Sequence, residues 1–166
     1  MKICYVMRGI PGSGKSHTAK TLVAKENIFS TDDFWGPDYD FDIKKIGIAH
    51  EWNQTRAARA MSMGDDNVVI DNTNTTWKEV EPYVLAAFKN GYDVVFQEPE
   101  SPWWEHVRNY IELGEEVSGW SEEKCVEELA KHGTHGVPEF VIKKMLSRWA
   151  LTDALERKRD EIKLSV

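Results

Sequence analysis

The chain has 166 residues, of which 41 % are apolar and 30 % are charged, a composition typical of folded chains and not of disordered ones. Its 28 acidic and 21 basic residues leave a net charge of −7, which excludes a protein that covers a long stretch of duplex nucleic acid with a basic face. Two distant cysteines, Cys4 and Cys125, predict neither a disulfide framework nor a zinc site, and no apolar run approaches the ~20 residues of a membrane span.

Short apolar segments alternate with helix-forming segments in the first part of the chain. Strands are expected over residues 2–8, 28–30, 68–70 and 93–97. Helices are expected over residues 16–25, 46–63, from an N-cap within 74–76 to about 89, 103–113, 121–132 and from 139 onward, with 114–119 as a surface loop. This alternation predicts an α/β fold in which helices cover both faces of a parallel sheet. We expect one domain over 1–166, without a signal peptide and therefore cytoplasmic.

The strongest motif, GIPGSGKS at Gly9–Ser16, matches the Walker A pattern and lies between an expected strand and an expected helix. Backbone N–H groups of such a loop surround phosphate oxygens at the positive end of the helix dipole. Lys15 is expected to reach the β- and γ-phosphates of ATP, and the Ser16 hydroxyl is expected to bind Mg²⁺. The motif by itself does not separate a kinase from an ATPase or a GTPase. The expected ATP-binding residues are Gly9, Pro11, Gly12, Ser13, Gly14, Lys15, Ser16, His17 and, from the last helical region, Arg148.

Carboxylates follow two of the expected strands, and the carboxyl ends of neighbouring parallel strands face one crevice. In the segment STDDFW we favour Asp32 as the general base of a phosphoryl transfer, and Asp33 as a helix cap or as the group that orients the base. The alternative for Asp32 is to hold the metal through water. The strand VVI ends in Asp71, which is expected to support Mg²⁺, while Asn72 and Asn74 are expected to line the crevice.

Five segments, in their order and spacing, resemble the P-loop kinases of the polynucleotide 5′-kinase type: GIPGSGKS, STDDFW, AHEWNQTRA, VVIDNTNTTW and HGVPEF. The similarity is closest to the kinase-like domains related to NEDD-four-binding protein 2 and more distant to the kinase module of bacteriophage polynucleotide kinase, and it covers about residues 3–149. It implies a P-loop NTPase fold with a helical lid, here near 121–149. It also implies transfer of the ATP γ-phosphate to a hydroxyl, typically the 5′-OH of DNA or RNA, with Lys15 and Ser16 at the phosphates and the metal and Asp32 as the base.

The chain differs from the phage-type pattern at three positions. Trp35 stands where that pattern has an arginine, and Asn72 stands where it has the acidic partner of that arginine. We expect Trp35 to stack on a nucleobase instead. His132 stands where the lid has the arginine that contacts the transferred phosphoryl group, and because histidine is a cation only at lower pH, turnover is expected to fall as pH rises. Lys131 and Arg148 are the alternatives for this lid cation.

The expected function is an Mg-ATP-dependent transfer of phosphate to a nucleic acid hydroxyl, with a polynucleotide 5′-OH as the leading acceptor. The acceptor side is expected to comprise Asp33, Trp35, Asn53, Arg56, Asn72 and Asn74, and the catalytic set is Lys15, Asp32 and His132. Two alternatives stay open: a kinase for a hydroxymethyl-pyrimidine base or a small nucleoside-like alcohol, and a non-catalytic ATP-binding scaffold. An apparent insertion at 103–120, rich in tryptophan, is expected to form a satellite core or, alternatively, to shape the acceptor site.

Overall fold

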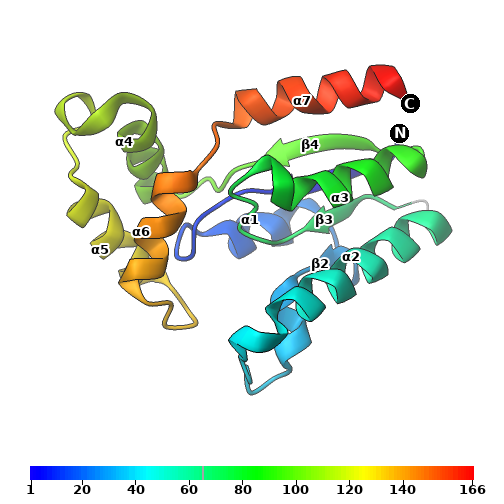
Figure 1. Ribbon diagram of the computed structural model, residues 1–166, viewed down its shortest axis with the longest axis horizontal. Helices are drawn as coiled ribbons and strands as arrows, with labels where there is room; N and C mark the ends of the chain where they lie inside the picture. Colours follow the sequence, from blue (N-terminus) through cyan, green and yellow to red (C-terminus); the bar gives the residue numbers. More distant parts are fainter. Residues whose placement is uncertain (65) are drawn as a thin grey trace.

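The computed structural model describes residues 1–64 and 66–166, and its centre is a parallel β-sheet (Figure 1). Within the described residues the sheet has the order β2-β3-β1-β4 and consists of β1 (Ile3–Met7), β2 (Ile28–Phe29), β3 (Val68–Ile70) and β4 (Asp93–Gln97). Val6 of β1 pairs with Ile70 of β3 on one side and with Phe96 of β4 on the other. Because all pairs are parallel, each strand is reached by a crossover, and the carboxyl ends of the strands meet at one edge.

Helices connect and follow these strands, as the alternating sequence pattern predicted. The α-helices are α1 (Lys15–Leu22), α2 (Ile46–Met63), α3 (Trp77–Lys89), α4 (Pro102–Ser118), α5 (Glu122–His132), α6 (Glu139–Arg148) and α7 (Thr152–Ser165). Short 3₁₀ helices lie over Lys25–Asn27, Thr31–Trp35 and Ile43–Lys45. None of the helices in the described part of the chain is long and apolar enough to cross a membrane.

Helices cover both faces of the sheet, so the predicted α/β arrangement is confirmed. On one face, Met7 and Val69 pack against Ala19 of α1. On the other face, Val6 and Ile70 belong to a larger core that also includes buried residues of α2, α3 and α7. The strands are apolar on both faces because neither face meets water.

Helix α7 lies beside β4, the strand at one edge of the sheet (Figure 1). The guanidinium of Arg159 donates to the carbonyl of Val94 over 3.1 Å, and the Lys163 ammonium pairs with Asp93 at 2.7 Å. Arg159 thereby occupies one carbonyl of a strand edge that would otherwise be free to pair with another chain.

Helices α4, α5 and α6 surround a second apolar core beside the strand ends (Figure 1). Its buried members include Trp104, Leu129 and Ile142, and Ile10 from the loop after β1 belongs to the same cluster. The tryptophans of the segment 103–120 all contact this cluster, so the satellite core expected there is confirmed. The helical region 121–149, called the lid below, is therefore packed against the loop after β1.

The expected surface loop at 114–119 is wrong, because α4 continues to Ser118. Gly114 interrupts the helix with φ of 85°, a backbone conformation that favours glycine. One more turn follows, and Gly119 ends it with its N–H donating to the Glu115 carbonyl at 2.8 Å. The glycines thus mark a kink and a C-cap instead of the two ends of a loop.

Candidate functional site

The loop between β1 and α1 has the backbone that a phosphate-binding loop requires. Gly12 and Gly14 adopt φ angles of 87° and 90°, in the left-handed region that favours glycine. A Cβ atom at Gly12 would lie 1.8 Å from the carbonyl oxygen of Leu129 in α5, so glycine is also required for space. Helix α1 begins at Lys15 and points its N-terminal N–H groups toward the loop. The predicted strand–loop–helix context is present.

Ser13 in this loop has a buried hydroxyl group that a ligand can engage. The residue is 1 % exposed, and its Oγ has no hydrogen-bond partner among the described residues. Buried hydroxyls are nearly always paired, so an unpaired one in this loop fits an anionic ligand such as phosphate. The Ser101 hydroxyl donates to the Ser13 carbonyl at 2.6 Å and thereby fixes the loop.

Asp71, directly after β3, joins the two polar residues at the end of the loop. Its Oδ1 pairs with the Lys15 ammonium at 3.1 Å, and its Oδ2 accepts from the Ser16 hydroxyl at 2.9 Å. A hydroxyl and a carboxylate in contact fit Mg²⁺, which keeps several waters and takes few protein ligands. The described residues contain no group of three or more His, Cys, Asp or Glu that could hold a metal ion, so Ser16 and Asp71 are the residues that would hold it.

Asp32, the expected base, lies in the 3₁₀ helix after β2 and has a half-exposed side chain. The Tyr39 hydroxyl donates to Asp32 Oδ1 at 3.1 Å, and His135 Nε2 lies 3.9 Å from Asp32 Oδ2. Burial and the charge of Asp32 raise the pKa of Tyr39, so this hydroxyl stays a hydrogen-bond donor. The described contacts of Asp32 are with Tyr39 and the lid, which favours the role of base over that of metal ligand.

A hydrogen bond between strand ends links the segment of Asp32 to the segment of Asp71. The amide N–H of Thr31 donates to Asn72 Oδ1 at 2.9 Å, and Asn72 follows Asp71 in the sequence. The candidate base and the Lys15–Asp71 pair therefore lie on neighbouring strand ends, as the parallel topology predicts.

Asp33 forms an ion pair with Arg56 of α2, with 2.7 Å between its Oδ2 and the guanidinium. Ser30 caps the 3₁₀ helix, because its hydroxyl accepts from the Asp32 amide at 3.2 Å, so the capping alternative for Asp33 is wrong. Arg56 also donates to Asn53 Oδ1 and to the Ser30 carbonyl, both at 2.8 Å. Asp33 and Arg56 thus hold the segment after β2 against α2, which orients the neighbouring Asp32.

Trp35 is a core residue, so the prediction that it stacks on a nucleobase is wrong. It is 6 % exposed, and its ring meets Phe34 and Phe41 edge to face, with 5.1 and 5.0 Å between ring centroids. The 3₁₀ helix turns this side chain inward, where the apolar ring is removed from water.

Three asparagines expected at the acceptor have structural partners. Asn53 is fully buried and donates to the Tyr83 hydroxyl at 2.9 Å, and Asn72 donates to the same hydroxyl at 3.2 Å. Asn74, also buried, adopts φ of 49° and donates to the Met7 carbonyl at 2.7 Å. These amides join the strand ends to each other and to α2. The prediction that Asn53 and Asn74 contact an acceptor directly is therefore wrong, and both residues support the site from inside the protein.

His132 does not lie at the candidate base. Its ring stacks on Trp103, with 3.7 Å between centroids, and its Nε2 is 3.7 Å from a glutamate one turn earlier in α5. Trp103 in turn donates from Nε1 to the Gly12 carbonyl at 2.8 Å. The lid histidine beside Asp32 is His135, and contact of His132 with the transferred phosphoryl group stays a prediction. Trp103 contacts the phosphate loop, and the alternative role of the insertion in shaping the acceptor site stays a prediction.

Arg148 and His17 lie at the margin of the loop. Arg148 Nε donates to Thr75 Oγ1 at 2.9 Å, and a terminal nitrogen lies 3.9 Å from Glu79, which holds the side chain at the start of α3. His17 is exposed on the first turn of α1. Contacts of these two residues with ATP stay predictions.

Arg8, which no motif singled out, supports the loop from inside the protein. It is fully buried, and its guanidinium donates to the carbonyls of Asn74 (2.9 Å), Thr75 (3.0 Å) and Ala150 (2.6 Å) and to the hydroxyl of Thr152 (2.7 Å). Burial lowers the pKa of Arg8 to about 10, and the charge of Glu98 opposes this shift, so the guanidinium stays charged at neutral pH.

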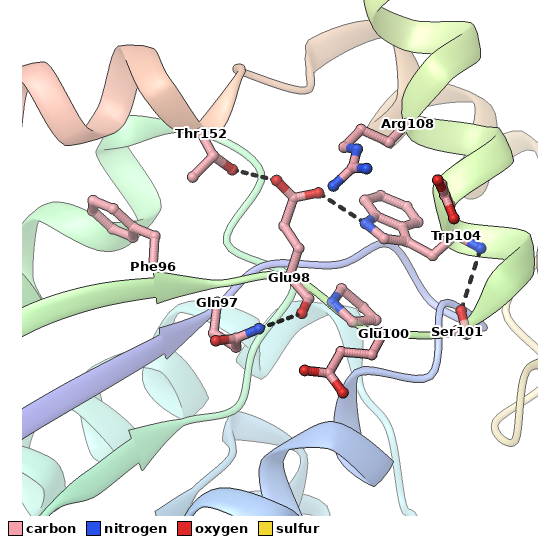
Figure 2. Close-up of a pocket in the computed structure, with 10 residues that line it drawn as sticks. Phe96, Gln97, Glu98, Glu100, Ser101, Trp104, Arg108 and Thr152 are labelled. Atoms are coloured by element: carbon pink, nitrogen blue, oxygen red, sulfur yellow. Dashed lines mark hydrogen bonds between the residues drawn. The ribbon is translucent and has the colours of Figure 1, made fainter. Parts of the chain in front are cut away.

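Glu98, directly after β4, lies in a hollow next to the phosphate loop (Figure 2). Its carboxylate oxygens accept from Trp104 Nε1 at 2.8 Å and from Thr152 Oγ1 at 2.6 Å, and Arg108 points toward the same carboxylate from α4. Ser101, which holds the phosphate loop, lies in the same hollow. Both carboxylate oxygens of Glu98 accept hydrogen bonds from within the protein. Glu98 therefore joins α4 and α7 to the end of β4.

Besides Arg8, three residues in contact with the site were missed at the level of sequence: Tyr39, Trp103 and His135. The segment KHGTHG shows that the lid has two histidines, but it does not show which one faces Asp32. Trp103 was visible only as part of an insertion. The contacts of these three residues join segments far apart in the chain, for which the sequence offers no signal.

Comparisons with known proteins agree with this geometry. A family described as an AAA domain matches residues 5–111. The chain is 37 % identical over 153 residues to human NEDD4-binding protein 2, an alignment that covers 89 % of this chain and 8 % of that protein. A chain from a structure of the Pnkp1/Rnl/Hen1 RNA repair complex aligns with a TM-score of 0.54 and 20 % identity, over 95 % of this chain and 46 % of that one. The last similarity concerns the fold.

Proposed function

The chain belongs to the AAA domain family, and on this premise we propose that it is an Mg-ATP-dependent kinase that phosphorylates the 5′-hydroxyl of a polynucleotide. The main support is the position of Asp32. This half-exposed carboxylate is oriented by Tyr39 and follows β2, the neighbour of β3, whose end carries the Asp71 that pairs with Lys15. A carboxylate that is open to solvent beside a phosphate loop can take a proton from the hydroxyl of a large acceptor.

The proposed reaction assigns one task to each polar residue. When bound at Ser16 and Asp71, Mg²⁺ would neutralise charge on the β- and γ-phosphate oxygens. Lys15 exchanges its ion pair with Asp71 for these oxygens and stabilises the charge that moves to the leaving group. Asp32 takes the proton of the acceptor hydroxyl while that oxygen bonds to the γ-phosphorus, and the bond from phosphorus to the β–γ bridging oxygen breaks to release ADP. Tyr39 holds the second oxygen of Asp32.

Two further observations support a strand end as the acceptor. The structural neighbour belongs to an RNA repair complex, which is consistent with a nucleic acid substrate. The net charge of −7 favours a short contact with a strand end over a long contact with a duplex. The chain spans 8 % of NEDD4-binding protein 2, so the activity proposed here concerns this chain and not that whole protein.

The direct test uses ATP labelled on its γ-phosphate. The chain is incubated with DNA and RNA oligonucleotides that carry either a 5′-hydroxyl or a 5′-phosphate, and Lys15→Ala serves as the control protein. Label is expected only on the 5′-hydroxyl strands and only with the unchanged chain. Label on free nucleosides or on hydroxymethyl-pyrimidine DNA alone would reassign the acceptor. ATP binding without transfer to any acceptor would identify a non-catalytic module.

A further inference from the structure

An open groove of about 500 Å³ lies on the outer face of α2. Its lining residues recur three or four positions apart and so share one helix face: Ile48, Glu51, Trp52, Thr55, Arg56 and Arg59. Ala57 and Met61, on the opposite face, belong to the core of the sheet. The groove is therefore a surface that the fold itself leaves open.

Trp52 and Arg56 form a fixed pair of flat groups in this groove. Trp52 is 36 % exposed, and the guanidinium of Arg56 lies 4.1 Å from a ring centroid of this indole. Arg56 is held in place by its hydrogen bonds to Asn53 and the Ser30 carbonyl and by its ion pair with Asp33. Bases of single-stranded nucleic acids stack on aromatic rings and on arginine planes of this kind.

The charge around the groove is opposite to that of the chain as a whole. From Ile43 to Met63 the sequence has four cations and one carboxylate, although the chain has a net charge of −7. Three of these cations, Lys44, Lys45 and Arg59, are exposed and form no ion pair within the described residues. Helix α4, by contrast, has four carboxylates and one cation. The α2 surface thus carries a local positive charge that attracts phosphates, although the chain as a whole is acidic.

The groove is continuous with the candidate base. Arg56 lines the groove and pairs at 2.7 Å with Asp33, which directly precedes Phe34 and follows Asp32. Phe34 meets Trp52 edge to face, with 5.6 Å between ring centroids. A single nucleic acid strand that lies along α2 therefore leads toward Asp32.

From these observations we propose that the outer face of α2 binds the single strand that presents the acceptor hydroxyl, and that a base of this strand stacks on Trp52. The part of this proposal that assigns the α2 face to the acceptor strand rests on the proposed function. Binding of a single strand to this face does not depend on it. Ile43 and Ile48 are also exposed, which a protein partner could cover, but the unpaired cations favour a polyanion.

Binding is measured without ATP, by fluorescence anisotropy of a labelled single-stranded oligonucleotide. Trp52→Ala is expected to weaken binding roughly five- to 150-fold, the range for loss of one base stack. Arg59→Gln is expected to weaken binding and to lower the slope of log affinity against log salt by about 0.7. The matched controls are Phe140→Ala, an exposed aromatic residue of α6, and Arg157→Gln, an exposed cation of α7, and both are expected to bind as the unchanged chain does.

Three outcomes would overturn the proposal, once circular dichroism shows that the variants are folded. The first is equal binding by the unchanged chain and Trp52→Ala. The second is absence of binding at low salt. The third is a dimer in sedimentation that Trp52→Ala converts to a monomer, because the groove would then be an interface between protein chains.

Kinase assays distinguish a failure of this proposal from a failure of the proposed function. The kcat/KM for a long oligonucleotide, divided by that for a dinucleotide, is expected to fall in Trp52→Ala. If Trp52→Ala transfers phosphate with an unchanged kcat/KM ratio, the proposal for the α2 surface is wrong and the proposed function is not affected. If the unchanged chain transfers phosphate to no acceptor, the proposed function fails, and the anisotropy of Trp52→Ala still decides whether α2 binds the strand.

Discussion

The imidazole of His135 lies parallel to the phenol ring of Tyr39, with 4.1 Å between their centroids and 8° between their planes. Tyr39 donates to one carboxylate oxygen of Asp32, and His135 lies 3.9 Å from the other. The lid and the loop after β2 therefore meet at the residue proposed to accept the proton. This contact gives the lid a direct way to influence the base.

Lys15→Ala is expected to lower phosphate transfer by about 10²-fold or more, because it removes the cation that stabilises charge on the phosphates. The measurement is turnover with γ-labelled ATP, with circular dichroism to show that the fold persists. Lys20→Ala, an exposed lysine in the same helix, is the control and is expected to keep full turnover. Near-normal turnover of Lys15→Ala would refute the phosphate-loop assignment.

Asp32→Asn is expected to lower turnover roughly 10²–10⁴-fold and to leave ATP affinity nearly unchanged, because the amide keeps the shape but takes no proton. Turnover and calorimetric ATP binding test this together. Asp38→Asn, exposed in the same loop, is the matched control. A collapse of ATP affinity would show that Asp32 serves the metal instead. An equal loss of turnover in Asp33→Asn would contradict the assignment of Asp32 alone as the base.

His135→Ala is expected to lower phosphate transfer through its effect on Asp32. The His135 Nε2 lies 3.9 Å from Asp32 Oδ2, and its ring stacks on Tyr39, which donates to the other oxygen of this carboxylate. Loss of the imidazole should therefore leave the proposed base less well oriented. His132→Ala, whose ring stacks on Trp103 instead, is the comparison and should lose less turnover. A larger loss in His132→Ala would favour the assignment of residue 132 made from sequence.

Trp103→Phe is expected to weaken ATP binding roughly two- to tenfold, the value of one hydrogen bond, because it removes the donor that fixes the Gly12 carbonyl. ATP titration by calorimetry measures the change. Trp120→Phe, whose ring stacks on His106 instead of reaching the phosphate loop, is the matched control. Equal affinities of the two variants would mean that the loop is held without Trp103.

The free energy of unfolding is expected to fall above about pH 9, in part through Cys4. Burial raises the pKa of Cys4 from 9.0 to about 12, so the unfolded chain loses this thiol proton before the folded chain does. The contribution is complete below pH 9 and is lost as pH rises toward 12, at up to about 1.4 kcal/mol per pH unit. Urea unfolding of the unchanged chain and of Cys4→Ala, from neutral to alkaline pH, should show a shallower slope for the variant. Identical slopes would contradict the prediction.

Local patterns predicted the elements that hold the site. The strand at 68–70, the strand at 93–97 and the helix at 46–63 lie where their apolar residues and end signals placed them. The Walker A spacing predicted the phosphate loop, because the positive φ angles at Gly12 and Gly14 depend only on the local turn of the backbone. Each of these features depends on neighbours in the sequence.

Side-chain directions were harder to predict, because they depend on segments that meet only in the folded chain. Trp35 turns into the core, although its place after the two aspartates resembled an acceptor position. His132 and His135 are nearly equivalent in sequence, yet Trp103 binds one and Tyr39 the other. The aromatic partner from a distant segment decides which histidine reaches Asp32.

The contacts of Arg8 are also completed late in protein synthesis. Its guanidinium needs Asn74 and Thr152, which lie 66 and 144 residues farther along the chain. When β1 leaves the ribosome these partners have not been made, so the charge stays in water and the strand cannot take its buried place. A nascent chain can therefore complete the contacts of Arg8 only after the connection to α7 has emerged.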